Sequence, residues 1–147
     1  MKAFRARFRK ASVASAEGLN YEPLPDELLA RYILSRNHFN SSRAKPLAFE
    51  PPKDLRLSVF RIFGLGEPQI WDLGYRHVAE PSNRTLYARA DFSVSLVNRL
   101  ALNVHRTDSP PRHADIVGWP SSKNERMSIA QQLAAESSLS FAPKATP

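Results

Sequence analysis

The amino-acid sequence predicts a single α+β domain, a mostly antiparallel sheet of about four or five strands flanked by two or three helices. Three observations lead to this class. The 147 residues suffice for one domain with its own core, strand-like segments succeed one another after residue 85, and a strongly signalled helix follows them. Successive strands with helices before and after them favour antiparallel pairing, with the helices on one face of the sheet.

The helices are predicted from caps and apolar spacing. Residues 23–35 are expected to be helical because Pro25 suits a first turn and two acidic residues follow it. A shorter helix begins at Pro68, after two glycines. The strongest signal is the S-x-x-E capping box of Ser122 and Glu125, which opens a helix that extends to residue 138.

Four segments have the period-two alternation of strands: residues 55–63, 85–91, 100–105 and 113–119. Residues 92–98 fit either a continued strand or a helical turn. In the third segment Leu100, Leu102 and Val104 form the inward face, so that the histidine at its end points the other way.

The composition is that of an ordinary globular protein, with 42% hydrophobic and 24% charged residues. Cysteine is absent, which excludes disulfides, thiolate metal sites and a cysteine nucleophile and fits a reducing, cytoplasmic location. No apolar run approaches the roughly 18 residues of a membrane span, and the N-terminus lacks the apolar segment of a secretory signal. We therefore expect no membrane partner.

The net charge of +7 is concentrated at the N-terminus. The first ten residues hold five basic and no acidic side chains, whereas the rest hold 21 − 5 = 16 basic against 14 acidic ones, a net of +2. A nucleic-acid footprint across the whole surface would give the opposite distribution. Arginine outnumbers lysine 15 to 6, which suits phosphate recognition; a bias in genomic base composition would give the same ratio.

A basic N-terminal arm with its linker, residues 1–20, precedes the predicted domain at 21–140, and residues 141–147 are expected to be a frayed tail. The arm alternates apolar and basic residues, the period of an edge strand. A flexible arm and an organellar targeting segment fit the same composition. In a nucleic-acid complex the cations would contact phosphates and the phenylalanines would stack on unpaired bases. The residues concerned are Lys2, Phe4, Arg5, Arg7, Phe8, Arg9 and Lys10.

The segment from His105 to Pro120 is the densest in groups that could perform chemistry. His105, Asp108 and His113 could surround a metal ion, but Arg112 and two prolines lie within the same loop, and a positive charge opposes cation binding. We therefore expect no metal. No cofactor motif is found, because the glycines at 64 and 66 lack the third glycine and the lysine of a phosphate loop.

The same loop suits a phosphate better. Arg112, together with Lys45, Arg61 and Arg89 from elsewhere in the chain, would form a cationic pocket, and the two histidines would serve as general acid and base if the protein is an enzyme. Structural roles compete with this interpretation. Arg112 would then pair with Asp115 or Asp91, and the arginine at the end of the 55–63 alternation with Asp54, Asp72 or Asp91, since a buried unpaired ion is very costly.

The leading hypothesis is a small basic domain that binds a phosphate-bearing partner, in the first place RNA or DNA, through the arm and the loop at 105–113. One alternative is a metal-free enzyme acting on a nucleotide or phosphodiester, with His105 and His113 as acid and base. Another is an adaptor subunit whose arm adds a strand to a partner's sheet. No motif of a known nucleic-acid-binding or catalytic family is found.

Overall fold

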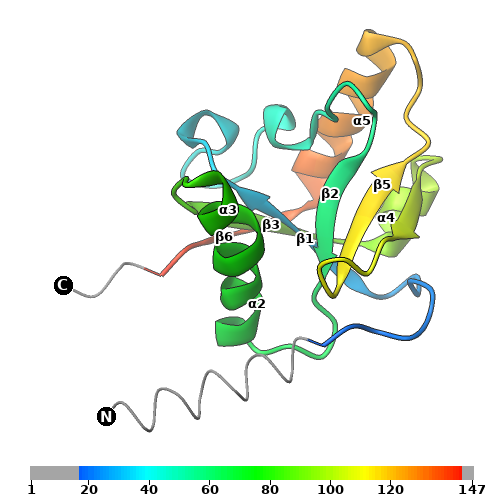
Figure 1. Ribbon diagram of the computed structural model, residues 1–147. Helices are drawn as coiled ribbons and strands as arrows, with labels where there is room; N and C mark the ends of the chain where they lie inside the picture. Colours follow the sequence, from blue (N-terminus) through cyan, green and yellow to red (C-terminus); the bar gives the residue numbers. More distant parts are fainter. Residues whose placement is uncertain (1–16, 144–147) are drawn as a thin grey trace, which may run out of the picture.

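Six strands form one sheet in the computed structural model, which describes residues 17–143 (Figure 1). The sheet order is β4-β5-β2-β1-β3-β6, and all neighbours pair antiparallel. The α+β class is confirmed, with one or two more strands than expected. The strands are Leu28–Ile33 (β1), Leu57–Arg61 (β2), Ala88–Ser93 (β3), Asn103–Arg106 (β4), His113–Val117 (β5) and Ser138–Phe141 (β6).

Helices cover both faces of the sheet, whereas the sequence pattern predicted one covered face. Leu133 of the C-terminal helix and Phe49 belong to one apolar core, and Ile70 and Trp71 belong to a second core on the opposite face. A sheet with two apolar faces must bury both of them. The helical segments are η1 (Arg36–His38), η2 (Pro46–Phe49), α2 (Glu67–Gly74), η3 (Tyr75–Ala79, a π-helical turn), α3 (Glu80–Ser82), α4 (Val94–Arg99) and α5 (Lys123–Glu136).

The first predicted helix, residues 23–35, is wrong: the segment is a turn followed by β1. This strand is central, and it contributes Leu29 and Ile33 to one core and Ala30 and Tyr32 to the other. A strand buried on both faces has no simple alternation and cannot be told from a buried helix by periodicity. The proline and acids that suggested a helix start belong instead to the turn before the strand.

The helix predicted from the capping box is confirmed. The side chain of Ser122 accepts a hydrogen bond from the amide of Glu125 at 3.4 Å, and α5 follows. β6 comes next and pairs with β3 at the sheet edge, although no strand was predicted there. Its side chains are small or partly exposed, which gives a weak alternation signal.

Helix α2 approaches the sheet closely at Gly74. A Cβ atom at this position would lie 2.6 Å from two ring carbons of Tyr32, so only glycine fits. The hydroxyl of Tyr32 donates to the carbonyl of Ile70 in the same helix. This contact fixes α2 over β1. In Figure 1, α2 lies on the side of β1, β3 and β6, away from β5. Among residues 17–143, no helix is long and apolar enough to cross a membrane.

Candidate functional site

The two candidate catalytic histidines lie on the same face of β4 and β5. His105 is paired across the sheet with Asp115, and the imidazole Nε2 of His113 lies 3.8 Å from Oδ1 of that aspartate. Residues two apart on a strand point to the same face, which places His113 and Asp115 together. Both histidines therefore flank one carboxylate, and His105 is exposed while His113 is half-buried.

Two hydroxyl groups hold the ring of His113. Its Nε2 lies 3.1 Å from Oγ of Ser58 on β2, and its Nδ1 lies 2.5 Å from Oγ1 of Thr107. Burial lowers the pKa of His113, and the nearby Asp115 opposes this only in part. The ring is therefore mainly neutral at pH 7 and can accept a proton. No pattern in the sequence points to these two hydroxyl residues, since a lone Ser or Thr is common at exposed positions.

Arg61, a predicted phosphate ligand, is fully buried in an ion pair with Glu27. Its Nε and Nη2 donate to the two carboxylate oxygens at 2.5 and 3.0 Å, and Nη1 donates to the carbonyl of Tyr21 at 2.9 Å. The acidic partner was expected, but among Asp54, Asp72 and Asp91, not at Glu27. This guanidinium would have to give up a bidentate pair to bind a phosphate.

Arg89 is also engaged with protein groups. It donates to Glu67 at 3.0 and 2.7 Å and to Asp91 at 3.1 and 3.2 Å, and its guanidinium lies 4.7 Å from the ring centre of Trp71. The hydrogen bonds of this arginine to Glu67 are the largest cause that lowers the pKa of that carboxyl. The guanidinium of Arg89 thus donates to two carboxylates, one of which, Glu67, is the first residue of α2.

Arg112 fastens the N-terminal part of the described chain to the sheet. Its Nη1 lies 2.5 Å from the carbonyl oxygen of Phe63 and 3.3 Å from that of Arg61, and its Nε lies 2.9 Å from that of Glu17. Nη2 of Arg106 also donates to the carbonyl of Leu19 at 3.1 Å, so arginine side chains hold residues 17–19 of the expected linker. The sequence suggested Asp115 or Asp91 as the partner of Arg112. In the three hydrogen bonds of Arg112 above, the acceptors are backbone carbonyl oxygens instead.

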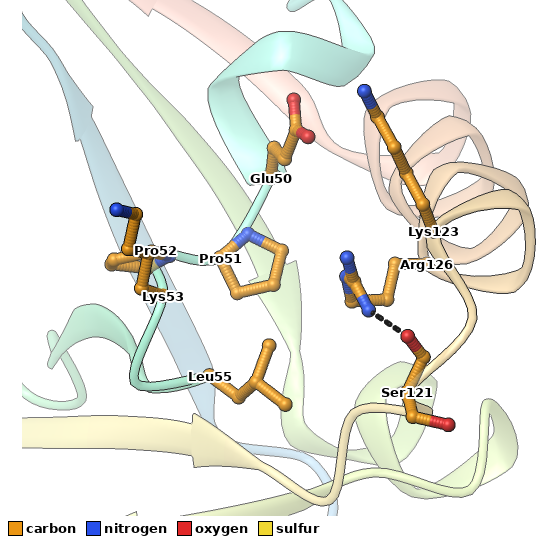
Figure 2. Close-up of a pocket in the computed structure, with 8 residues that line it drawn as sticks. All are labelled: Glu50, Pro51, Pro52, Lys53, Leu55, Ser121, Lys123 and Arg126. Carbon is orange, nitrogen blue, oxygen red and sulfur yellow. Dashed lines mark hydrogen bonds between the residues drawn. The ribbon is translucent and has the colours of Figure 1, made fainter.

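Lys45, the remaining predicted phosphate ligand, is exposed just before η2. It does not line the cleft of Figure 2 or the acidic cavity described further below, and the three arginines are occupied as described above. The structure thus brings His105 and His113 to one face, while Arg61, Arg89 and Arg112 are bonded to protein oxygens. The seven residues named in the N-terminal arm lie outside the described residues.

A cationic cleft that the sequence analysis missed lies between the loop after η2 and the start of α5 (Figure 2). It has a volume of about 490 Å³. Lys53 and Lys123 lie on opposite sides of it, Pro51 and Arg126 lie between them, and Glu50 is the one acid among the eight residues that line it. The two lysines are 70 positions apart in the sequence, so no local pattern could reveal the cleft.

The cations of this cleft have few partners. Lys53 and Lys123 are exposed and make no ion pair with any residue of the range 17–143. Nη1 of Arg126 donates to the carbonyls of Pro120 and Ser121 at 3.1 and 2.6 Å, which holds the guanidinium inside the cleft (Figure 2). Three positive charges face one negative charge here.

Among residues 17–143, no group of three or more His, Cys, Asp or Glu side chains lies close enough to hold a metal ion. Comparisons with protein-family models, with curated proteins and with solved structures found no match for this chain. Its function is therefore inferred from the chemistry of its own side chains.

Proposed function

We propose that the protein binds a phosphate-bearing partner, RNA or DNA, at the cationic cleft, with the basic arm adding affinity. The observation that supports this most is the pair of exposed lysines, Lys53 and Lys123, on opposite sides of a cleft in which Arg126 is held by backbone carbonyls. Elsewhere in the described chain the large cationic side chains at 61, 89 and 112 are occupied by protein oxygens.

Several features of the cleft suit a phosphate diester. Lys123 is the first residue of α5, where the positive end of the helix dipole favours an anion. Exposed lysines lose little hydration on meeting a phosphate and release counterions from the nucleic acid. Pro51 and Leu55 give the cleft an apolar floor that a sugar or base can contact (Figure 2).

The N-terminal arm would supply the sequence-independent part of the affinity. Five cations within residues 2–10 could contact several phosphates. Residues 17–143 alone hold 15 basic and 14 acidic side chains and would attract a polyanion only locally. The arm and the cleft therefore have different roles: the arm increases affinity for any polyanion, and the cleft fixes where the backbone lies.

A titration followed by nuclear magnetic resonance tests this proposal. A short single-stranded oligonucleotide is added to the ¹⁵N-labelled full chain at low salt, and we expect the largest amide shifts at Lys53, Ser121 and Lys123. Shifts that spread evenly over the surface, or that centre on β4 and β5, would contradict binding at the cleft. Inorganic phosphate in a parallel titration separates a general anion effect from recognition of a polynucleotide.

A second candidate function is metal-free chemistry on a nucleotide or phosphodiester at the β4–β5 surface. The observation that favours it is the arrangement of Ser58, His113 and Thr107, in which a half-buried imidazole is held by two hydroxyls beside an exposed histidine. His113 would accept a proton and His105 would donate one. Loss of either group should lower turnover by about two to four orders of magnitude. If the purified protein turns over none of a panel of RNA, DNA and nucleotide substrates, this candidate is excluded.

A further inference from the structure

An acidic cavity lies at the opposite end of β2 from the cationic cleft. It has a volume of about 320 Å³ and lies between the turn before β1, the loop after β2 and the start of α2. Its charged lining consists of Asp26, Glu67 and Asp91 with a single cation, Arg89. Three acids against one arginine leave an excess of two negative charges when all are ionised.

The acids of this cavity are incompletely neutralised. Glu67 and Asp91 share the one guanidinium of Arg89. Asp26 is exposed and makes no ion pair or side-chain hydrogen bond within the described residues. Burial raises the pKa of Asp91, a sign that its charge lacks sufficient compensation. An additional cation would relieve this imbalance.

The rim of the cavity is apolar. Leu28 and Phe63 line it and are 45% and 55% exposed, two of the large hydrophobic side chains that the described domain leaves open to water. A ligand that fits must therefore combine positive charge with apolar groups. An inorganic cation would satisfy the acids but would leave this rim exposed.

The chain itself carries a segment of this composition, and it enters the described domain beside the cavity. Residues 2–10 hold five cations and no acid, with Phe4 and Phe8 between them. Arg112 bonds both to the carbonyl of Glu17, the first described residue, and to that of Phe63 on the cavity rim. The seven Cα–Cα steps from position 10 to position 17 could span roughly 23 Å when extended, enough to reach the cavity.

We propose that this acidic cavity receives the chain's own basic segment, residues 2–10. Its arginines would pair with Asp26, Glu67 and Asp91, and its phenylalanines would pack on the apolar rim. A cation near a partly desolvated carboxylate gains more than one at an open surface. The docking stands whether or not the segment binds nucleic acid. If it does, a polyanion must compete with the cavity for the same cations.

The absence of cysteine makes a direct test simple. A nitroxide label is attached to the full chain through Ala6→Cys, and paramagnetic broadening of backbone amides is measured at low salt. We expect strong broadening at Leu28 and Gly64 and little at Lys53, beside the cationic cleft. The broadening should weaken several-fold at about 0.5 M salt, where charges are screened within a few ångströms.

Matched charge variants complete the experiment. Asp26→Asn should reduce the broadening without unfolding the domain, since this side chain has no partner to lose within the described residues, and the pair Asp26→Asn with Glu67→Gln should reduce it further. Glu125→Gln, an exposed acid on α5, is the control and should leave the pattern unchanged. Uniform broadening, or a maximum away from the cavity, would overturn the proposal. So would broadening that appears only when labelled and ¹⁵N-labelled chains are mixed, because the segment would then dock between two copies.

Discussion

The two ends of β2 hold arginine and lysine side chains in opposite circumstances. At the end of the strand, Arg61 is fully buried and bonded to Glu27 and a carbonyl. Before its start, Lys53 is exposed in a cleft shared with Lys123, and neither makes an ion pair with a described residue. A cation therefore indicates a binding site only when the protein has not already supplied its counter-charge.

Burial explains why the two ends differ. An arginine stays charged at any physiological pH, so a buried one needs a carboxylate or several carbonyls within hydrogen-bond distance. Arg61 has both, and these bonds also fasten residues 21–27 to the sheet. An exposed lysine keeps its hydration, needs no protein partner, and remains available to a phosphate. The first arrangement supports the fold, and the second leaves binding capacity at the surface.

The largest expected effect is on stability at the buried end. Arg61→Met should lower the free energy of unfolding by about 3 kcal/mol or more, because it leaves the carboxylate of Glu27 buried without its partner. Urea denaturation followed by circular dichroism measures this. A second change, Glu27→Gln, made in the Arg61→Met background, should restore part of the loss. An Arg61→Met protein as stable as the wild type would contradict the structural role and leave Arg61 open as a ligand.

An intermediate effect is expected at the cleft. Arg126→Gln removes two hydrogen bonds to the carbonyls of Pro120 and Ser121, of which Ser121 is exposed to water. We expect a loss of about 0.5–1.5 kcal/mol in the same urea experiment, together with weaker oligonucleotide binding. A loss as large as that of Arg61→Met would show that this arginine, too, is committed to the fold, and the contrast between the two ends would fail.

The smallest effect concerns His113, which pairs with Phe60 of β2 between the two ends. Burial lowers its pKa from the ordinary value of 6.5. Below pH 6.5 the unfolded chain takes up a proton before the folded protein does, so His113 contributes stability that is lost as the pH falls. His113→Gln should therefore make unfolding less dependent on pH below about 6.5. Identical pH slopes for variant and wild type would contradict the burial of this ring.

The sequence predicted those features that depend on local signals. The capping box of Ser122 correctly predicted the start of α5. The alternation over residues 100–105, which contain β4, correctly placed His105 on the side opposite to Leu102 and Val104. β1 was missed because a central strand with two buried faces lacks the period of two. The need of Arg61 for an acid followed from its place at the end of a buried alternation, but its partner lies 34 positions away, where no local pattern reaches.

The candidate site was harder to predict than the fold for the same reason. Lys53 and Lys123 line the same cleft only because η2 packs against α5, and this packing depends on the whole sheet order. The arginines that the sequence suggested as phosphate ligands, Arg61, Arg89 and Arg112, are instead bonded to protein oxygens. Exposed lysines in ordinary polar surroundings carry no sequence signal, although they remain available to a ligand.

The most direct test of this account measures oligonucleotide binding across a salt series for three proteins. These are the wild type, the double variant Lys53→Gln with Lys123→Gln, and the control Lys45→Gln, which removes an exposed lysine that does not line the cleft. Fluorescence anisotropy of a labelled single strand gives the dissociation constant at each salt concentration. We expect the double variant to bind more weakly, with a slope of log K against log salt smaller by about 1.4, while the control follows the wild type. Equal affinity and slope for the double variant and the wild type would contradict phosphate binding at the cleft.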